Sequence, residues 1–444
     1  MLVFSGYVMG LARDRIFART FGAGAELDAY NAAFVLPELT LGVLVASGLA
    51  APFVPIFLGL KREDHAAARD FAQTILTGAV LAMGVAGAMM LVLAPATVSL
   101  VAPGFDAGER DLYVALFRLM LVTPILFAAS TALGEVLVAE RRFLAYGLAP
   151  LLYNGGIVIG TLMLAPSIGI FGGAVGAILG ALLHLLIRVW GLRGTGVRPR
   201  PRFAIRMPAV GDFIRLMLPK MLSQPGEQLT FLFFTAVASS LAAGSISAIN
   251  FARNFQSVGV SLVGVAFSLA VFPVLSSSYA AGDRSGFTSA LARTLATVSA
   301  LTVAGAIFVF VVGRPAIEIF LGGGAFDAAD VALTSAVLSA FALSIPLESI
   351  THVLSRAIYA TRHTLLQVAA SLTGLVATVG ATLLLVGPLG ILAVPIGFTI
   401  GQAVKVVLLV VVLAWRMRLF AASAPAAAAT SAAASVRESS ARPR

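Results

Sequence analysis

Residues 71–99, FAQTILTGAVLAMGVAGAMMLVLAPATVS, form an apolar stretch without a single charged side chain. A helix of about 20 apolar residues crosses the hydrocarbon core of a bilayer, so this stretch predicts a membrane-spanning helix. Similar runs recur along the whole chain of 444 residues, which is 59% hydrophobic and 11% charged. Soluble domains carry roughly 25% charged residues, and the alternating pattern of an outer-membrane barrel is absent. The sequence therefore predicts an all-α polytopic membrane protein.

Twelve membrane spans are predicted from the apolar runs and the breaks between them. They are residues 1–21, 28–58, 71–99, 112–138, 144–165, 169–190, 213–240, 246–278, 288–313, 328–355, 364–386 and 390–415. Several are longer than a bilayer requires and contain proline, so we expect those helices to be tilted, kinked or extended. The segment 417–444, rich in alanine and serine with interspersed proline and arginine, is expected to be a disordered cytoplasmic tail.

The orientation follows from the Lys and Arg residues between the spans. With the N-terminus in the cytoplasm, the opposite side holds only Arg110 and Arg314. The cytoplasmic connections and the tail carry Lys61, Arg62, Arg69, Arg141, Arg142, Arg188, Arg193, Arg198, Arg200, Arg202, Arg206, Arg284, Arg356, Arg362, Arg416, Arg418, Arg437, Arg442 and Arg444. This bias satisfies the positive-inside rule and predicts that both termini are cytoplasmic. It also accounts for most of the net charge of +10, so no nucleic-acid partner is expected.

An internal repeat divides the chain. Motifs in the first half return in the second at a nearly constant offset of about 221 residues. The pairs are Gly104–Ala107 with Ala325–Ala328, Pro124 with Pro346, Arg141 with Arg362, Gly169–Ile170 with Gly390–Ile391, and Gly176 and Gly180 with Gly397 and Gly401. Duplication of a six-span unit predicts two six-helix lobes in parallel orientation, a plan found in many secondary transporters. We expect an N-lobe at 1–190, a basic cytoplasmic linker at 191–210 and a C-lobe at 211–416.

Signals for enzymatic chemistry are missing. The chain has no cysteine, and its four histidines lack the spacing of metal ligands. A phosphate-binding loop, a nucleophile elbow and a zinc-protease motif are also missing. The sequence therefore predicts a protein that is not an enzyme and has no cofactor or metal, and it identifies no coupling cation.

Charged residues inside the predicted spans are the informative ones, because an ionised side chain at a helix centre costs roughly 2.5–3.5 kcal/mol. The first span contains GLARDRIFARTFGAG at residues 10–24. We expect Arg13, Asp14, Arg118 and Arg253 to line a polar cavity, with a buried structural ion pair as the alternative. Arg15 is left unassigned, and Arg19 either faces the cavity or reaches the membrane surface.

Basic residues from both lobes would suit a substrate with several negative charges, such as a lipid linked through pyrophosphate. The planar guanidinium group matches phosphate oxygens in geometry. Glu348 and Lys405 also lie within predicted spans and receive less weight as cavity residues.

Several segments are similar to the MurJ/MviN family, the proposed flippases for lipid II within the MOP exporter superfamily. They are GLARDRIFARTFGAGAELDAYNAAFVLP at 10–37, APFVPIF at 51–57, APGFD at 102–106 and LAAGSISAINFARNFQSVGVSLVGVAFSLAVFPVLS at 241–276. The resemblance implies two six-helix lobes of the MOP/MATE type around a cationic cavity that opens to either side alternately. It also implies functional roles for Arg13, Asp14 and Asp28, which match charged positions of the family.

Other positions depart from the family pattern. Gly6, Leu41, Gly42 and Ala46 replace charged residues that are common there, and Asn254 takes the place of an arginine, with Arg253 beside it. Members often have two further C-terminal spans without a counterpart here, and the chain starts so close to its first span that a few upstream residues are expected.

The resemblance implies a lipid II flippase in the bacterial cytoplasmic membrane, with Arg13, Asp14, Asp28, Arg118, Arg253 and Asn254 as cavity residues. Expected partners are lipid II or a similar polyprenyl-pyrophosphate saccharide, membrane lipids, and other cell-wall synthesis proteins. Two alternatives stay open: a flippase for another undecaprenyl-linked saccharide or another MOP-type exporter, and a non-transporting membrane scaffold in cell-wall synthesis.

Overall fold

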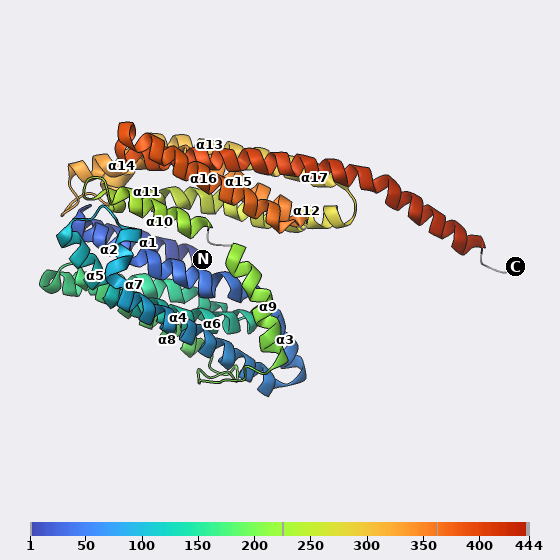
Figure 1. The fold of residues 1–444 in the computed structure, drawn as a ribbon, viewed down its shortest axis with the longest axis horizontal. Coiled ribbons are helices and arrows are strands. Elements are labelled where there is room, and N and C mark those ends of the chain that lie inside the picture. Colours follow the sequence, from blue (N-terminus) through green and yellow to red (C-terminus); the bar gives the residue numbers. More distant parts are fainter. Residues whose placement is uncertain (1, 224–225, 362, 441–444) are drawn as a thin grey trace. The chain divides into compact units, whose positions relative to one another are not determined.

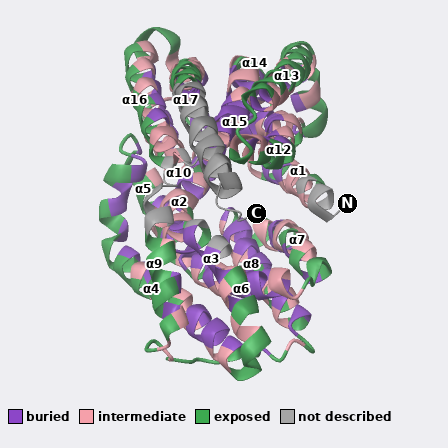
Figure 2. Ribbon diagram, turned by 90° about the vertical axis from the view of Figure 1, so that its right-hand side faces the viewer, coloured by how far each residue is buried: buried purple, intermediate pink, exposed green. Residues whose placement is uncertain are grey.

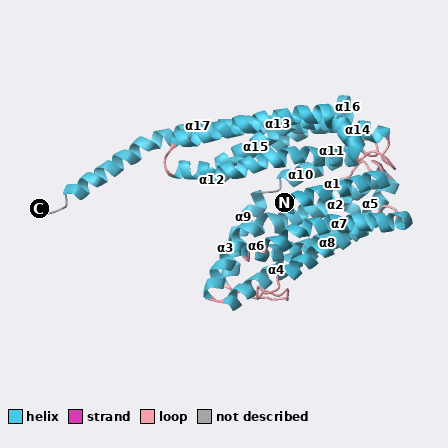
Figure 3. Cartoon of the chain, turned by 180° about the vertical axis from the view of Figure 1, so that it is seen from behind, coloured by secondary structure: helices cyan, strands magenta, loops and turns pink. Residues whose placement is uncertain are grey.

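The computed structural model describes residues 2–223, 226–361 and 363–440, and these form helices and connecting loops without a β-strand (Figures 1 and 3). The elements of the first half are α1 (Leu2–Phe21), α2 (Ala25–Leu41), the π-helix η1 (Gly42–Ala46), α3 (Ser47–Glu63), α4 (His65–Val101), α5 (Ala107–Met120), α6 (Val122–Ala139), α7 (Phe143–Ile168) and α8 (Phe171–Gly191). Those of the second half are α9 (Pro208–Ser223), α10 (Gly226–Ala238), α11 (Ser245–Gly259), the π-helix η2 (Val260–Val265), α12 (Ala266–Ala280), α13 (Arg284–Phe320), α14 (Ala328–Ala342), α15 (Ser344–Ala360), α16 (Thr364–Leu389), the 3₁₀-helix η3 (Gly390–Leu392) and α17 (Ala393–Ser440).

Among the described residues, each predicted span consists mainly of helix, so the prediction of an all-α polytopic protein is confirmed. Among the described residues, 8 helical segments are long and apolar enough to cross a membrane, and a ninth consists of α14 and α15, bent by 43° at their junction. One of these segments, Leu365–Arg418, contains two predicted spans. The charged α1 and the shorter helices α9 and α10 account for the remaining two of the twelve predicted spans.

The internal repeat is visible in the lengths and ends of the helices. Helices α4 and α13 each contain 37 residues, and α7 and α16 each contain 26. Both members of the second pair end at a glycine with positive φ, +57° at Gly169 and +54° at Gly390. A π-helix follows α2 and another follows α11. The duplication predicted from the sequence therefore extends to local backbone geometry.

The repeated Phe-Asp motif starts a helix in each half. The carboxylate of Asp106 accepts a hydrogen bond from the Glu109 amide at 2.9 Å, and the Glu109 carboxylate accepts one from the Asp106 amide. Asp327 accepts from the amides of Ala329 and Asp330 at 2.7 and 2.9 Å. Both aspartates thereby satisfy backbone donors that a helix start leaves unpaired.

The chain divides into two compact units. The first comprises Met1–Phe251 with Pro315–Thr334, and the second Ala252–Arg314 with Ser335–Arg444. Aromatic side chains such as Phe53, Phe57 and Phe71 form a buried core in the first unit. The second unit has its own core, which includes Leu275, Phe287 and Leu409. The lobe boundaries expected from the sequence stay a prediction.

Large apolar side chains are exposed at many positions of the surface. Figure 2 shows exposed positions along α13. Phe308 and Phe310 in this helix are each 64% exposed, and Val311 is 68% exposed. Contiguous apolar surface on this scale would be unfavourable in water. It is consistent with a protein whose solvent is the lipid hydrocarbon.

Two local features differ from the sequence analysis. Arg188, which we counted as a loop cation, lies buried in α8, where it donates to the Ser130 carbonyl at 2.6 Å and stacks on the Tyr146 ring. Its long side chain turns into the protein because these partners compensate for the loss of water. The second feature is α17, which continues as helix to Ser440 across most of the tail expected to be disordered. Alanine, frequent in this segment, has the highest helix propensity.

Glycines allow α7 and α8 to approach closely. A Cβ atom on Gly156 would overlap the backbone of Gly180, and one on Gly160 would overlap that of Gly176. Gly172, Gly176 and Gly180 therefore act as helix contacts. Such small-residue contacts are how helices associate in membranes, where lipid offers no hydrophobic drive between them.

This contact predicts that Gly156→Ala destabilises the protein by about 1–3 kcal/mol, because the added methyl group overpacks the interface. Gly155→Ala is the matched control, since a Cβ atom there meets nothing within 4 Å. It should be neutral or stabilising, because alanine favours the helix. Thermal unfolding of both variants in detergent measures the difference, and equal melting temperatures would contradict the interpretation.

Candidate functional site

The charged motif of α1 forms an ion pair between neighbouring residues. The Nε and Nη2 atoms of Arg13 donate to Oδ1 of Asp14 at 3.0 and 2.7 Å. The Asp14 side chain is buried, with 7% exposure, whereas 30% of the Arg13 side chain is accessible. The carboxylate therefore holds the guanidinium in place while part of that cation stays available to a further anion.

Polar groups from two other helices surround Arg13. Tyr30 and Glu38 of α2 and Tyr153 of α7 lie close enough to interact with it electrostatically. Glu38 is exposed although it belongs to an apolar helix. Three helices of the first unit thus contribute to one polar region around the cation, as expected for a surface that faces water or substrate and not hydrocarbon.

Asp28, in the first turn of α2, caps the start of α11. Its carboxylate accepts hydrogen bonds from the amide of Gly244 at 2.8 Å and from the amide and hydroxyl of Ser247 at 2.7 and 2.6 Å. Asp28 is only 3% exposed. A carboxylate at a helix N-terminus satisfies unpaired amides and interacts favourably with the helix dipole, so Asp28 fixes α2 against α11.

The glycine that precedes α11 is required for this arrangement. Gly244 has a φ of +90°, and a Cβ atom there would overlap the carbonyl group of Ala23. A larger residue would therefore meet both backbone strain and a steric clash.

The corner between α1 and α2 also contacts the loop before α14 and the first turn of that helix. The Ala23 amide donates to Asp330 at 3.0 Å, and the Ala325 amide donates to the Arg19 carbonyl at 2.8 Å. Arg15 donates to the last carbonyls of α13, those of Ile319 and Phe320, at 2.9 and 3.1 Å. Arg15 thereby satisfies acceptors at a helix C-terminus, a role that the sequence left unassigned.

A second buried ion pair lies within the other unit. Arg253 of α11 makes a two-pronged contact with Glu348 of α15, both hydrogen bonds being 2.7 Å long. Gln256 also hydrogen-bonds to both partners, and the Phe398 ring lies 4.8 Å from the guanidinium carbon. Arg253 is 6% exposed and Glu348 8%. The charges are thus paired and hydrogen-bonded, as burial requires.

The structure brings some of the predicted site residues together. Arg13 and Asp14 pair directly, whereas Asp28 and Arg253 each contact other partners. Arg118 is exposed on α5, and Asn254 is half-buried beside Arg253. Sequence reasoning underestimated Glu348 and missed Gln256. An acidic residue inside an apolar span was the available signal, since such a charge needs a partner.

Long apolar helices, buried charged side chains and an internal repeat of helix lengths define a polytopic helical membrane protein. A solved structure of the lipid II flippase MurJ in an inward closed conformation aligns with 93% of this chain and 86% of its own, with a TM-score of 0.81 and 22% identity. An inward-facing multidrug resistance MATE transporter of the MOP superfamily aligns with 96% of this chain and 97% of its own, with a TM-score of 0.80 and 17% identity. These likenesses establish the fold.

The family is established by sequence. Residues 17–437 match the family model described as lipid II flippase MurJ, so the chain belongs to that family. The lipid II flippase MurJ of Burkholderia cenocepacia is 27% identical over 365 residues, which cover 78% of this chain and 70% of the relative. The resemblance drawn from the sequence motifs is therefore confirmed.

The cap on α11 predicts a specific loss of stability. Asp28→Ala should cost about 1–2 kcal/mol, because three buried amides and a hydroxyl lose their acceptor, and Asp28→Asn should cost less because it keeps one oxygen. Glu26→Ala is the control, an exposed acidic residue in the same helical turn. Thermal unfolding in detergent measures all three variants. Equal losses for Asp28→Ala and Glu26→Ala would exclude a special role for the cap.

The buried pair predicts non-additive effects. Glu348→Ala leaves Arg253 buried without its carboxylate and should cost about 3–5 kcal/mol, whereas the double variant Arg253→Met with Glu348→Leu should recover most of this loss. Glu318→Ala, at an exposed position of α13, is the control. Folded yield and melting temperature are measured for the double variant and for Arg253→Met and Glu348→Leu singly, and simple addition of the two single effects would contradict direct pairing.

Proposed function

We propose that the chain carries lipid II, the lipid-linked peptidoglycan precursor, across the cytoplasmic membrane by alternating access. The observation that carries this proposal is the match to the lipid II flippase family over residues 17–437. The partly accessible Arg13 at an otherwise apolar depth supports it, because a pyrophosphate that crosses a membrane needs a cation inside the protein. The protein would move its substrate without chemical conversion.

Arg13 is the proposed first contact of the pyrophosphate. Two of its nitrogens are engaged by Asp14, and the remaining part of the guanidinium is available for charge-assisted hydrogen bonds to phosphate oxygens. Asp14 would orient the side chain and limit its net positive charge. Such a balance suits a carrier, which has to release its substrate as well as bind it.

Arg118, Arg253 and Asn254 are the further proposed contacts. Arg118 is exposed and needs no rearrangement to meet an anion. Arg253 is held by Glu348 and Gln256, so a phosphate would have to replace the carboxylate. This exchange of anionic partners offers a way to couple binding to a change of conformation, which requires differential affinity between two states.

Asp28 is the proposed gating residue. Under the predicted orientation, the corner between α1 and α2 faces the outer side of the membrane. Its contacts with residues 244–247 and 322–330 would then close that side. Opening would have to break the hydrogen bonds of Asp28, so their strength would set part of the barrier.

We also propose an N-lobe at residues 1–190 and a C-lobe at residues 211–416, joined by the linker 191–210. Both termini would lie in the cytoplasm. Other cell-wall synthesis proteins and membrane lipids are proposed partners. No coupling cation is assigned.

One alternative is a carrier for another undecaprenyl-linked saccharide. Gly6, Leu41, Gly42 and Ala46 stand where charged residues are common in the family, which favours different contacts to the head group. A scaffold without transport activity is the alternative of another class.

The assignment of Arg13 predicts that Arg13→Ala abolishes complementation in cells depleted of their lipid II flippase, at normal membrane abundance. Arg13→Lys should retain partial activity, because lysine keeps the charge but loses the planar fork. Arg284→Ala, at the exposed start of α13, is the control. Normal growth with Arg13→Ala would overturn the role of Arg13.

Liposomes that contain the purified chain separate the three functions. With lipid II as substrate we expect flipping, and Arg13→Ala should slow it roughly tenfold or more, the loss expected for a hydrogen-bonded charge. Flipping of an unrelated lipid-linked saccharide alone would favour the first alternative, and flipping of neither would favour the scaffold.

A further inference from the structure

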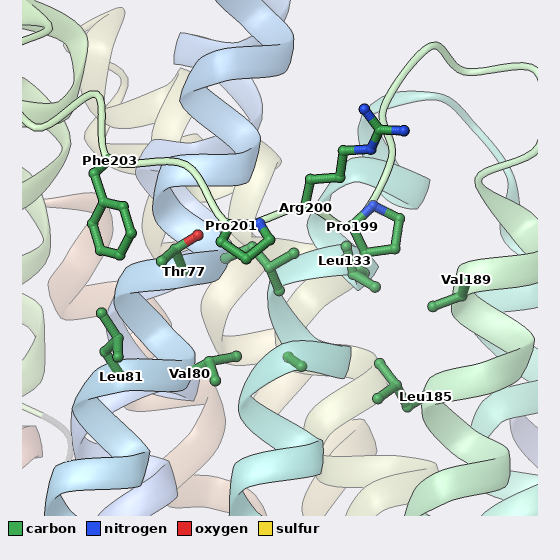
Figure 4. A pocket seen from close by; sticks show the side chains of 12 residues that line it. Thr77, Val80, Leu81, Leu133, Leu185, Val189, Pro199, Arg200, Pro201 and Phe203 are labelled. Carbon is green, nitrogen blue, oxygen red and sulfur yellow. The ribbon is translucent and has the colours of Figure 1, made fainter.

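A cavity of about 460 Å³ lies within the first unit, between helices α4, α6 and α8 and the basic linker (Figure 4). Aliphatic side chains form most of its wall, among them Leu76, Val80, Leu133, Leu185 and Val189. Its size falls within the roughly 300–1,000 Å³ typical of small-molecule sites. A cavity with so few polar groups does not hold water stably, so its wall is suited to hydrocarbon.

The linker covers one end of this cavity with Pro199, Arg200, Pro201 and Phe203. It is fastened to the first turns of α4. The Arg198 carbonyl accepts from Gln73 at 2.8 Å, and the Arg202 amide donates to Thr77 at 3.0 Å. An ion pair of 2.7 Å joins Arg202 to Asp70. The cover is therefore built into the fold.

Charge is concentrated on the outer side of this cover. Arg193, Arg198, Arg200 and Arg206 are exposed, and no carboxylate of the described chain lies within ion-pair distance of them. Figure 4 shows the Arg200 guanidinium directed away from the aliphatic side chains, on the opposite face of the linker. The apolar wall of the cavity and the exposed arginines therefore lie on opposite sides of the same stretch of linker.

Exposed apolar residues of the linker suit a position at the membrane surface. Phe203 and Ile205 are 67% and 71% exposed, and Arg202 and Arg206 flank them. Apolar side chains among arginines are typical of segments that lie in the interface between lipid and water. Leu81, which lines the cavity, is 50% exposed, so the cavity opens sideways onto the surface of α4.

We propose that this cavity binds an anionic phospholipid, with one acyl chain against α4, α6 and α8 and the phosphate at Arg200. Under the predicted orientation the lipid belongs to the cytoplasmic leaflet, where basic pockets between helices recognise anionic head groups. The occupant is a resident lipid and not the transported substrate, because the cavity opens to the surface of α4 and lies apart from Arg13. The proposal does not depend on lipid II transport.

Native mass spectrometry of the full chain in detergent tests the proposal. The chain is titrated with phosphatidylglycerol or with phosphatidylcholine of the same acyl composition, and we expect preferential retention of phosphatidylglycerol. Arg200→Gln should weaken its binding about fivefold, the contribution of one basic residue near an anionic surface. Val80→Trp, which fills the cavity without changing the charge, should reduce retention of both lipids.

Arg284→Gln is the control, an exposed arginine at the start of α13, and it should bind like the unaltered chain. Arg200 is itself exposed, so its variant should fold normally, and unchanged melting temperatures would verify this. Equal retention of the two lipids, or equal binding by Arg200→Gln and the unaltered chain, would overturn the proposal. Stronger retention of undecaprenyl phosphate than of phosphatidylglycerol would also overturn the phospholipid as occupant.

Discussion

The cost of placing a charge in hydrocarbon governs how this protein is built. Four ionic side chains of the helices each meet a partner that replaces water: Asp14 for Arg13, the start of α11 for Asp28, Glu348 for Arg253, and a carbonyl with an aromatic ring for Arg188. Because an uncompensated charge would cost several kcal/mol, these contacts determine which helices must lie together. Lipid accommodates apolar surfaces equally well anywhere on the protein, so these surfaces do much less to determine which helices lie together.

The two halves of the chain share a backbone plan but compensate for buried charges with different residues. Equal helix lengths, π-helices and glycine ends recur in the two halves, so the backbone plan is shared. The charged contacts are not: Asp28 binds backbone amides at a helix end, whereas Arg253 binds a side-chain carboxylate inside its unit. A common backbone plan with unlike charged contacts makes the two halves chemically distinct.

Residue patterns predicted the helices and the repeat because each depends on local composition or on spacing along the chain. A pairing of Arg13 with Asp14 is also within reach of sequence reasoning, because the two residues are adjacent in the chain. Partners distant in sequence were harder. Nothing local links Arg253 to Glu348, which are 95 residues apart, and Arg188 resembled a loop cation because it stands at the end of an apolar run. Tertiary packing decides such pairs.

The glycine contact between α7 and α8 also has a thermal consequence. Two backbones that touch through Gly156 and Gly180 are held by dispersion forces and do not depend on the release of ordered water. The hydrophobic effect, which drives the burial of apolar groups away from water, weakens on cooling because it is entropic near room temperature. The helix pair lacks that dependence, and it should stay rigid in the cold while water-driven contacts at the membrane surface loosen.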